Sequence, residues 1–163
     1  MIENKMNEMM VIGLGETAGD LIADLPEMNN FAKLVALREG KRYGRDSKIK
    51  LINLKERNPW RELWVPEGGI IVLADLDSLE RGEELLKLNK KLSHKKVVFL
   101  LMRPHRLEGD LKLNRANLII EKLLENKAAV LCFDDEVMIS NMRSSVNDAF
   151  ANKRNLMTQS IAY

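Results

Sequence analysis

Side chains that build disulfide and metal frameworks are scarce in this sequence. Its 163 residues include one cysteine, Cys132, and two histidines, His94 and His105. A single cysteine excludes a disulfide within the chain and a cysteine-cluster metal site, and so few histidines do not suit a histidine-rich zinc site. Because aromatic residues make up only 5% of the chain, leucine, isoleucine, valine and nine methionines must supply most of the core.

Charge of one sign and long apolar runs are also lacking. The 26 lysine and arginine residues nearly balance the 24 aspartate and glutamate residues, and the formal net charge is +2. This balance does not favour a nucleic-acid or membrane-surface protein on charge alone. No uninterrupted apolar run approaches the roughly 18 residues that a membrane helix needs, and residues 1–10 carry no signal-peptide apolar stretch. We therefore expect a globular protein of the cytoplasm, with no membrane segment.

Five short apolar runs are present instead, at residues 9–12, 49–54, 70–74, 97–102 and 128–133. They are nearly continuous and rich in β-branched residues, which is typical of strands buried on both faces of a parallel sheet. Helical patterns alternate with them, at residues 16–25, 30–39, 78–92, 111–125 and 142–162. Pro26 cannot continue the first of these helices, and Gly40 follows the second in the C-terminal capping position.

This alternation of strands and helices predicts the fold class. We expect one domain over residues 1–163 with a doubly wound, Rossmann-like α/β fold. Its mostly parallel sheet should have about five strands, with helices on both faces and a long C-terminal helix. In such folds ligands bind beyond the carboxyl ends of the strands. Functional residues are therefore expected in the loops that follow the apolar runs.

The loop after the first apolar run is rich in glycine. Glycines let the backbone turn tightly, and the N-terminus of the following helix offers N–H groups to a phosphate. The third glycine comes one residue later than in the Gly-x-Gly-x-x-Gly pattern, and Glu16 places a carboxylate where a phosphate would lie. The alternative is a strand-to-helix turn that needs glycine for its geometry alone, and the sequence leaves both interpretations open. The candidate phosphate-binding residues here are Gly13, Gly15, Thr17, Gly19 and Asp20.

The same glycines also allow a third interpretation, a small dinucleotide-binding module. Such modules carry an acidic side chain that binds a ribose at the end of the second strand. The predicted second strand, at residues 49–54, is followed by Lys55 instead. This interpretation therefore ranks last.

Two carboxylates follow the apolar run at residues 70–74. Asp75 and Asp77, together with Glu16 after the first strand, resemble the "E … DxD" pattern of Toprim enzymes, the topoisomerases and primases. In that family the carboxylates hold Mg²⁺ for phosphoryl transfer, so a magnesium-dependent enzyme is the alternative function. The more favoured interpretation is that Asp77 or Ser78 caps the following helix.

Several stretches, taken in order, are similar to motifs of another family. Residues 11–15 (VIGLG) are similar to "VIGVGGGG", and residues 52–53 to the start of "INTD". Residues 97–109 (VVFLLMRPHRLEG) resemble "GVVTKPFxFEG", and residues 130–136 resemble "DTLIVIPNDRL". Residues 145–161 resemble "AFxxADEVLxxxVxGI", the start of a long central helix. These motifs belong to FtsZ, so the chain resembles the nucleotide-binding half of the FtsZ/tubulin family.

The resemblance implies a site for GTP or GDP, formed in part by the glycine-rich loop. Phe150 matches the aromatic residue that stacks on guanine, and Glu108 matches the ribose-side glutamate. Lys112 stands at the position of the basic partner of that glutamate, and Asp134 stands where the family has an asparagine.

The departures from the family pattern concern phosphate binding and hydrolysis. The "GGGTGTG" phosphate loop is replaced by residues 75–82, which lack the glycine cluster, and Arg154 stands where a carboxylate is expected. The second domain, whose acidic residues complete a neighbour's catalytic site in family polymers, is not expected. The resemblance thus implies a degenerate, non-hydrolysing domain that binds GTP or GDP weakly or has lost nucleotide binding. It would act through a protein partner or self-association, with nucleic acid a less favoured partner.

Overall fold

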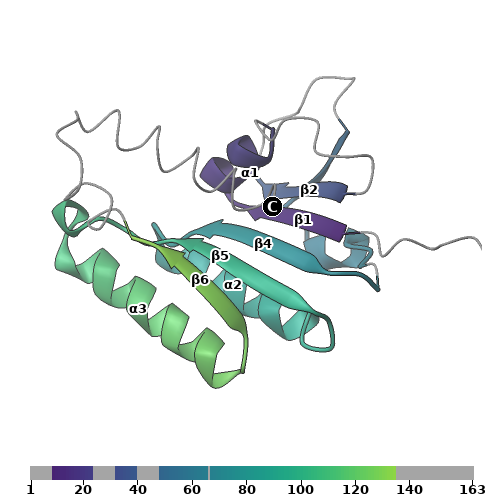
Figure 1. Cartoon of the computed structure of the whole chain (residues 1–163). Coiled ribbons are helices and arrows are strands. Elements are labelled where there is room, and N and C mark those ends of the chain that lie inside the picture. Colours follow the sequence, from purple (N-terminus) through teal and green to yellow (C-terminus); the bar gives the residue numbers. More distant parts are fainter. Residues whose placement is uncertain (1–8, 24–31, 40–47, 66, 135–163) are drawn as a thin grey trace, which may run out of the picture.

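The computed structural model of this protein describes residues 9–23, 32–39, 48–65 and 67–134 (Figure 1). Its centre is one six-stranded sheet in the order β3-β2-β1-β4-β5-β6, and every neighbouring pair of strands is parallel. The chain order reverses between β1 and β4, which is where ligands bind in doubly wound sheets. The strands are β1 (Met9–Leu14), β2 (Ala32–Arg38), β3 (Ile49–Asn53), β4 (Ile70–Asp75), β5 (Val97–Met102) and β6 (Ala129–Phe133).

Helices cover both faces of this sheet. The described helices are α1 (Glu16–Ala23), α2 (Leu79–Lys91) and α3 (Asp110–Glu125), with two 3-10 turns, η1 (Pro59–Glu62) and η2 (Arg106–Glu108). Figure 1 shows α2 and α3 on one face of the sheet and α1 on the other. The predicted doubly wound α/β fold is confirmed, whereas the helix predicted at residues 142–162 lies outside the described residues.

The helix predicted for residues 30–39 is wrong, because residues 32–38 form β2 and raise the number of strands from five to six. Alanine, leucine, lysine and arginine all favour helices, so local propensity pointed away from a strand. In the folded chain this segment lies between β1 and β3 and pairs with both. Its last four residues, 35–38, are all buried. Pairing on two sides and burial on two faces override propensity here.

The core has two parts, one on each face of the sheet. Along β1, Met10, Ile12 and Leu14 pack on the side of α2 and α3, and Val11 packs on the side of α1. This alternation follows from the two-residue period of a strand. The larger part includes Phe99 of β5, while the smaller part is formed largely by residues of α1 and its neighbouring strands.

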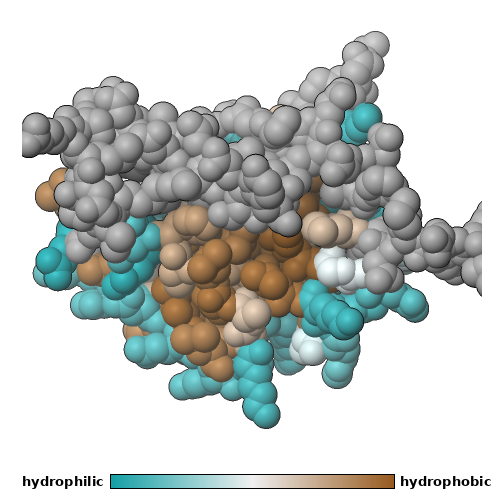
Figure 2. All heavy atoms as spheres, viewed as in Figure 1, coloured by the Kyte–Doolittle hydropathy of each residue, from teal (hydrophilic) through white to brown (hydrophobic). Residues whose placement is uncertain are grey.

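Part of the α1 face of the sheet stays partly exposed among the described residues. Hydrophobic residues gather over β4, β5 and β6 in the view of Figure 2. Val98 of β5 and Leu131 of β6 are 42% and 50% exposed there. No described helix is both long enough and apolar enough to span a membrane.

Candidate functional site

The glycine-rich turn lies at the carboxyl edge, by which we mean the edge of the sheet where all the parallel strands end. Gly15 follows β1 and has a φ of +98°, a left-handed conformation that glycine adopts without steric cost. Its N–H donates a hydrogen bond to the carbonyl of Leu37 at the end of β2, at 2.8 Å. The turn is therefore fixed to the neighbouring strand before α1 begins.

Gly13 permits close packing of α1 on β1. A Cβ at this position would lie 2.5 Å from Cδ1 of Ile22 and 2.7 Å from the carbonyl oxygen of Ala18, both on α1. Neither a side chain nor a helical carbonyl can be approached so closely, so glycine is needed for geometry here. Gly19 belongs to the helix itself, since its N–H donates to the carbonyl of Gly15 at 2.9 Å. These contacts support the structural interpretation of the motif.

The guanidinium of Arg81 lies directly over the turn. A Cβ on Gly15 would be 2.6 Å from Nε and 2.8 Å from Cζ of Arg81. Nη1 of Arg81 donates to Oε2 of Glu84 at 2.6 Å, and the two side chains are only 17% and 15% exposed. The space above the turn is thus occupied by a cation that is already paired. The sequence predicted neither residue for the site, although Arg81 and Glu84 have the i,i+3 spacing of a helical ion pair.

Acidic side chains gather around Glu84 at this corner of the sheet. Burial raises the pKa of Glu84 above its ordinary value, the Arg81 guanidinium lowers it, and the carboxylates of Glu80 and Glu39 raise it further. Lys55, which follows β3, donates to Glu39 at 2.7 Å. This hydrogen bond and the charge of Glu39 raise the pKa of Lys55. A phosphate approaching this corner would meet several carboxylates.

Arg38 at the end of β2 holds α1 in place. It is a buried charged residue, 1% exposed. Its Nη2 donates to Oε2 of Glu16 at 2.5 Å, and its Nη1 donates to Oδ1 of Asp20 at 2.8 Å. Glu16 and Asp20 are one helical turn apart on α1, which brings both carboxylates to one guanidinium. Thr17, between them, is exposed. Two residues predicted to bind ligands thus make structural ion pairs.

The carboxylates after β4 do not gather into a metal-binding cluster. Asp75 ends β4 and Asp77 is exposed. Ser78 caps α2, because its Oγ accepts the N–H of Arg81 at 3.2 Å, and the capping interpretation is confirmed. Among the described residues, no group of three or more Asp, Glu, His or Cys is placed to hold a metal ion. Magnesium binding by Glu16, Asp75 and Asp77 stays a prediction without a cluster to support it.

The loop after β5 brings together the two residues predicted to lie near a ribose. Glu108 accepts the N–H of His105 at 2.9 Å, and Nζ of Lys112 donates to Glu108 at 3.2 Å. Arg103, also after β5, donates to Oδ2 of Asp134 at the end of β6, at 2.9 Å. Phe150 lies outside the described residues. Ligand binding by these residues stays a prediction.

Comparison with known proteins identifies the fold. Neither models of protein families nor characterised proteins match the sequence. Solved structures do match. An empty FtsZ dimer from M. jannaschii has a TM-score of 0.70 and 14% identity, and the match covers 98% of this chain and 55% of that one. The chain has the fold of the N-terminal half of FtsZ/tubulin proteins.

Other members of this structural group match at similar coverage. CetZ2 from Haloferax volcanii, in a GTPγS-bound protofilament, has a TM-score of 0.68 and 17% identity, covering 95% of this chain and 57% of CetZ2. The monomeric subunit of TubZ from bacteriophage PhiKZ has a TM-score of 0.58 and 10% identity, covering 94% of this chain and 59% of TubZ. The chain spans little more than half the length of these structures. The predicted resemblance is confirmed at the level of the fold.

Proposed function

We propose that this chain is a single, non-hydrolysing FtsZ/tubulin-like domain of the cytoplasm, which acts through contacts with other protein chains. Guanine nucleotide binds to it weakly or not at all. The observation that carries this proposal is the position of Arg81, whose Nε lies 2.6 Å from where a Cβ of Gly15 would be. A phosphate on the N-terminus of α1 would need the same space.

The residues that replace the phosphate loop support this proposal. Backbone N–H groups can cradle a polyphosphate only where no side chain blocks the approach. Residues 75–82 contain a single glycine, Gly82. The missing Cβ of Gly82 makes room for Ile119 of α3, whose Cγ1 would be 2.7 Å away. That glycine therefore serves the contact between two helices and is not available to a nucleotide.

The charges of the carboxyl edge support it as well. Arg38 and Arg81 are the cations nearest the glycine-rich turn in the contacts described above, and both are held by carboxylates of this chain. A nucleotide would have to displace those carboxylates to use either guanidinium. Protein contacts remain as a mode of action, and two matched relatives are structures of assemblies, an FtsZ dimer and a CetZ2 protofilament.

Calorimetric titration with GTP, with and without Mg²⁺, tests the proposal together with an assay of phosphate release. We expect no protein-dependent turnover and a dissociation constant weaker than about 1 mM, or about −4 kcal/mol. Arg81→Ala opens the space over Gly15, so its affinity for GTP should rise by about tenfold, or about 1.4 kcal/mol. Lys91→Ala, which removes the same charge at the far end of α2, should bind as the unchanged protein does.

Two results would contradict the proposal. Phosphate release that scales with protein concentration would contradict the proposal that the domain does not hydrolyse GTP. Micromolar GTP binding by the unchanged protein would show that the ion pairs of the carboxyl edge yield to a nucleotide. If Arg81→Ala and Lys91→Ala bind GTP equally, Arg81 is not the barrier.

A further inference from the structure

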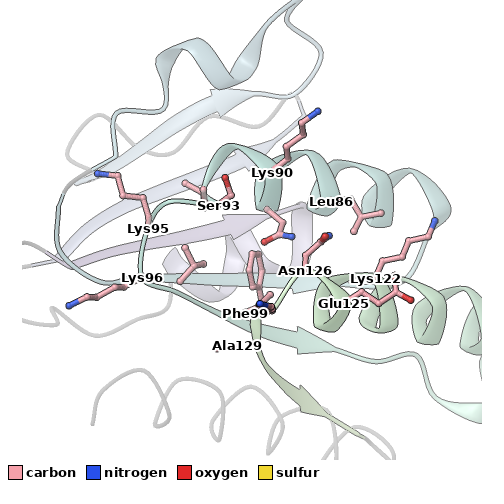
Figure 3. A pocket seen from close by; sticks show the side chains of 15 residues that line it. Leu86, Lys90, Ser93, Lys95, Lys96, Phe99, Lys122, Glu125, Asn126 and Ala129 are labelled. Carbon is pink, nitrogen blue, oxygen red and sulfur yellow. The ribbon is translucent and has the colours of Figure 1, made fainter.

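A large cavity opens at the opposite edge of the sheet, between the C-terminal ends of α2 and α3 (Figure 3). Its volume is about 700 Å³, and it reaches the amino ends of β5 and β6. The apolar residues that line it are Leu86, Leu92, Val97, Phe99, Ala128 and Ala129. Five lysines also line it, Lys90, Lys95, Lys96, Lys122 and Lys127, against a single acidic residue, Glu125. We call it the lysine-rimmed cavity.

The lysines surround an apolar interior. Phe99 and Leu92 are 1% exposed and belong to the core beneath it. Leu86, Val97 and Ala128 are partly exposed, and all five lysines are exposed. In Figure 3 the labelled lysines extend outward, around Phe99 and Asn126. An apolar centre within a polar rim is typical of a site for another protein chain, and here the rim carries mostly positive charge.

Helix stability explains only part of this charge. Lys90 and Lys122 stand in the last turns of α2 and α3, where a cation interacts favourably with the helix dipole. Lys95, Lys96 and Lys127 lie beyond the helix ends, and no ion pair with them is described. Cations placed around one hollow repel each other, so the fold alone gives no reason for these three.

Lys127 occupies a position where another residue would be more stable. Its φ is +59°, and it stands just after α3 in a helix-ending motif. In that motif Lys127 N–H donates to the carbonyl of Leu124 at 2.9 Å, and Ala128 N–H donates to that of Leu123 at 3.0 Å. Glycine or asparagine usually fills this left-handed position. A lysine there strains the backbone and brings one more positive charge to the rim.

We propose that the lysine-rimmed cavity binds an acidic segment of a partner protein. The segment places apolar side chains against Leu86 and Val97, which are partly exposed, and its carboxylates lie among the lysines. Charge complementarity selects an acidic partner, and the apolar interior favours a peptide over the phosphates of nucleic acid or lipid, which need only the charge. The inference rests on the proposed function, because it names the partner chemistry for a domain that acts through protein contacts.

Selection from a random peptide library displayed on phage tests this inference. Peptides enriched on the unchanged protein should combine aspartate and glutamate with leucine, phenylalanine or other apolar residues. Their affinities are then measured by fluorescence anisotropy at two salt concentrations, and binding should weaken as salt rises. A single-stranded DNA oligonucleotide and phosphatidylserine vesicles are measured in parallel.

Three variants connect binding to the cavity. Lys95→Glu/Lys96→Glu reverses the charge of the rim, and Asn89→Trp fills the cavity from α2 without changing its charge. Each should weaken binding of the selected peptides by about tenfold or more. Lys127→Gly should weaken binding while raising the midpoint of thermal unfolding, an opposition that a merely structural role would not produce. Circular dichroism confirms that each variant is folded.

The matched control is Arg57→Glu/Arg115→Glu. Both arginines are exposed and lie outside the cavity lining, and the change in net charge equals that of Lys95→Glu/Lys96→Glu. This variant should bind the peptides as the unchanged protein does. Equal losses in both double variants would overturn the inference, because net charge and not the cavity would then govern binding.

The remaining outcomes are equally decisive. No enrichment, or enrichment of peptides without acidic residues, overturns the inference. Binding of DNA or vesicles that Asn89→Trp leaves unchanged shows a general polyanion surface and also overturns it. GTP turnover is measured on the same samples. If the protein turns over GTP and also binds the peptides, only the proposed function is overturned. If it neither turns over GTP nor binds peptides, only this inference is overturned.

Discussion

Arg38 and Arg81 are both held in ion pairs near the glycine-rich turn. Arg38 comes from β2 and pairs with two carboxylates of α1, while Arg81 comes from α2 and pairs with Glu84 of the same helix. In both cases a guanidinium that could receive a phosphate is already held by the chain. Under the proposed function, this side-chain pairing, and not the shape of the sheet, is what keeps a nucleotide from this edge.

Contacts between residues near each other in sequence are easier to predict than the ion pairs of Arg38. The cap of α2 by Ser78 depends on a hydrogen bond to a residue three positions later, so the local pattern contains it. The pairs of Arg38 join residues 18 and 22 positions apart, across a segment predicted as a helix. Because the sequence predicts residues 30–39 as a helix and not as a strand, it does not predict the partners of Arg38.

Cys132 on β6 offers a pH-dependent test of charge at the carboxyl edge. Partial burial raises the pKa of its thiol above its ordinary value, Arg103 lowers it, and Asp134 raises it. Since only the thiolate is alkylated, iodoacetamide should react slowly at neutral pH, with a rate midpoint above the ordinary pKa of a cysteine thiol. Asp134→Asn should lower this midpoint and Arg103→Ala should raise it, as followed by mass spectrometry. Cys132 is the only cysteine, so no other thiol contributes.

For Cys132 the decisive result is that the pH midpoint of alkylation moves in opposite directions in Asp134→Asn and Arg103→Ala. Asp134→Asn also introduces the asparagine that the FtsZ pattern has at this position, which makes it a conservative change. If the midpoint stays constant in Asp134→Asn, the carboxylate does not act on the thiol.

At the scale of elements, glycines set how closely helices approach their neighbours. Gly13 lets α1 pack closely on β1, and Gly82 lets α2 pack closely on α3. The sequence predicts a glycine-rich turn from strand to helix within residues 13–20. The pattern alone does not distinguish a loop that binds phosphate from a turn that needs glycine for its geometry. That distinction depends on which atoms face the missing Cβ, and those atoms come from elsewhere in the chain.

Gly82→Ala tests the contact between α2 and α3. Alanine favours a helix over glycine by about 1 kcal/mol, but its Cβ would lie 2.7 Å from Cγ1 of Ile119. Overpacking of this kind costs about 1–3 kcal/mol. We therefore expect the free energy of unfolding in urea to fall by about 1 kcal/mol.

The matched background for Gly82→Ala is Ile119→Ala, which removes the opposing side-chain atoms. In that background the clash is absent, so Gly82→Ala should raise the free energy of unfolding by about 1 kcal/mol through helix propensity. The sign of the effect should thus reverse between the two backgrounds. An equal cost in both would mean that the two helices do not meet at Gly82.

For the molecule as a whole, the two edges of the sheet differ in how their charges are paired. Acidic and basic side chains form ion pairs at the carboxyl edge, whereas five lysines and one glutamate line the cavity at the amino edge. A net charge of +2 does not reveal this difference. The alternation of strands and helices sufficed to predict the fold class, whereas the FtsZ/tubulin resemblance was drawn from short motifs along the chain. Composition alone could not predict which edge would be basic.

Strand order also predicts how stability is distributed over the molecule. β1 and β4 lie at the centre of the sheet and are buried along most of their length, while β3 and β6 are the outermost described strands and are more exposed. Because local opening exposes edge strands before central ones, amide hydrogen exchange followed by mass spectrometry should label β3 and β6 first. Amides of β1 and β4 should exchange more slowly by about tenfold or more, through global unfolding. If β6 is protected as strongly as β1, another segment covers the outer side of β6. The strand order given above would then lack one element beyond β6.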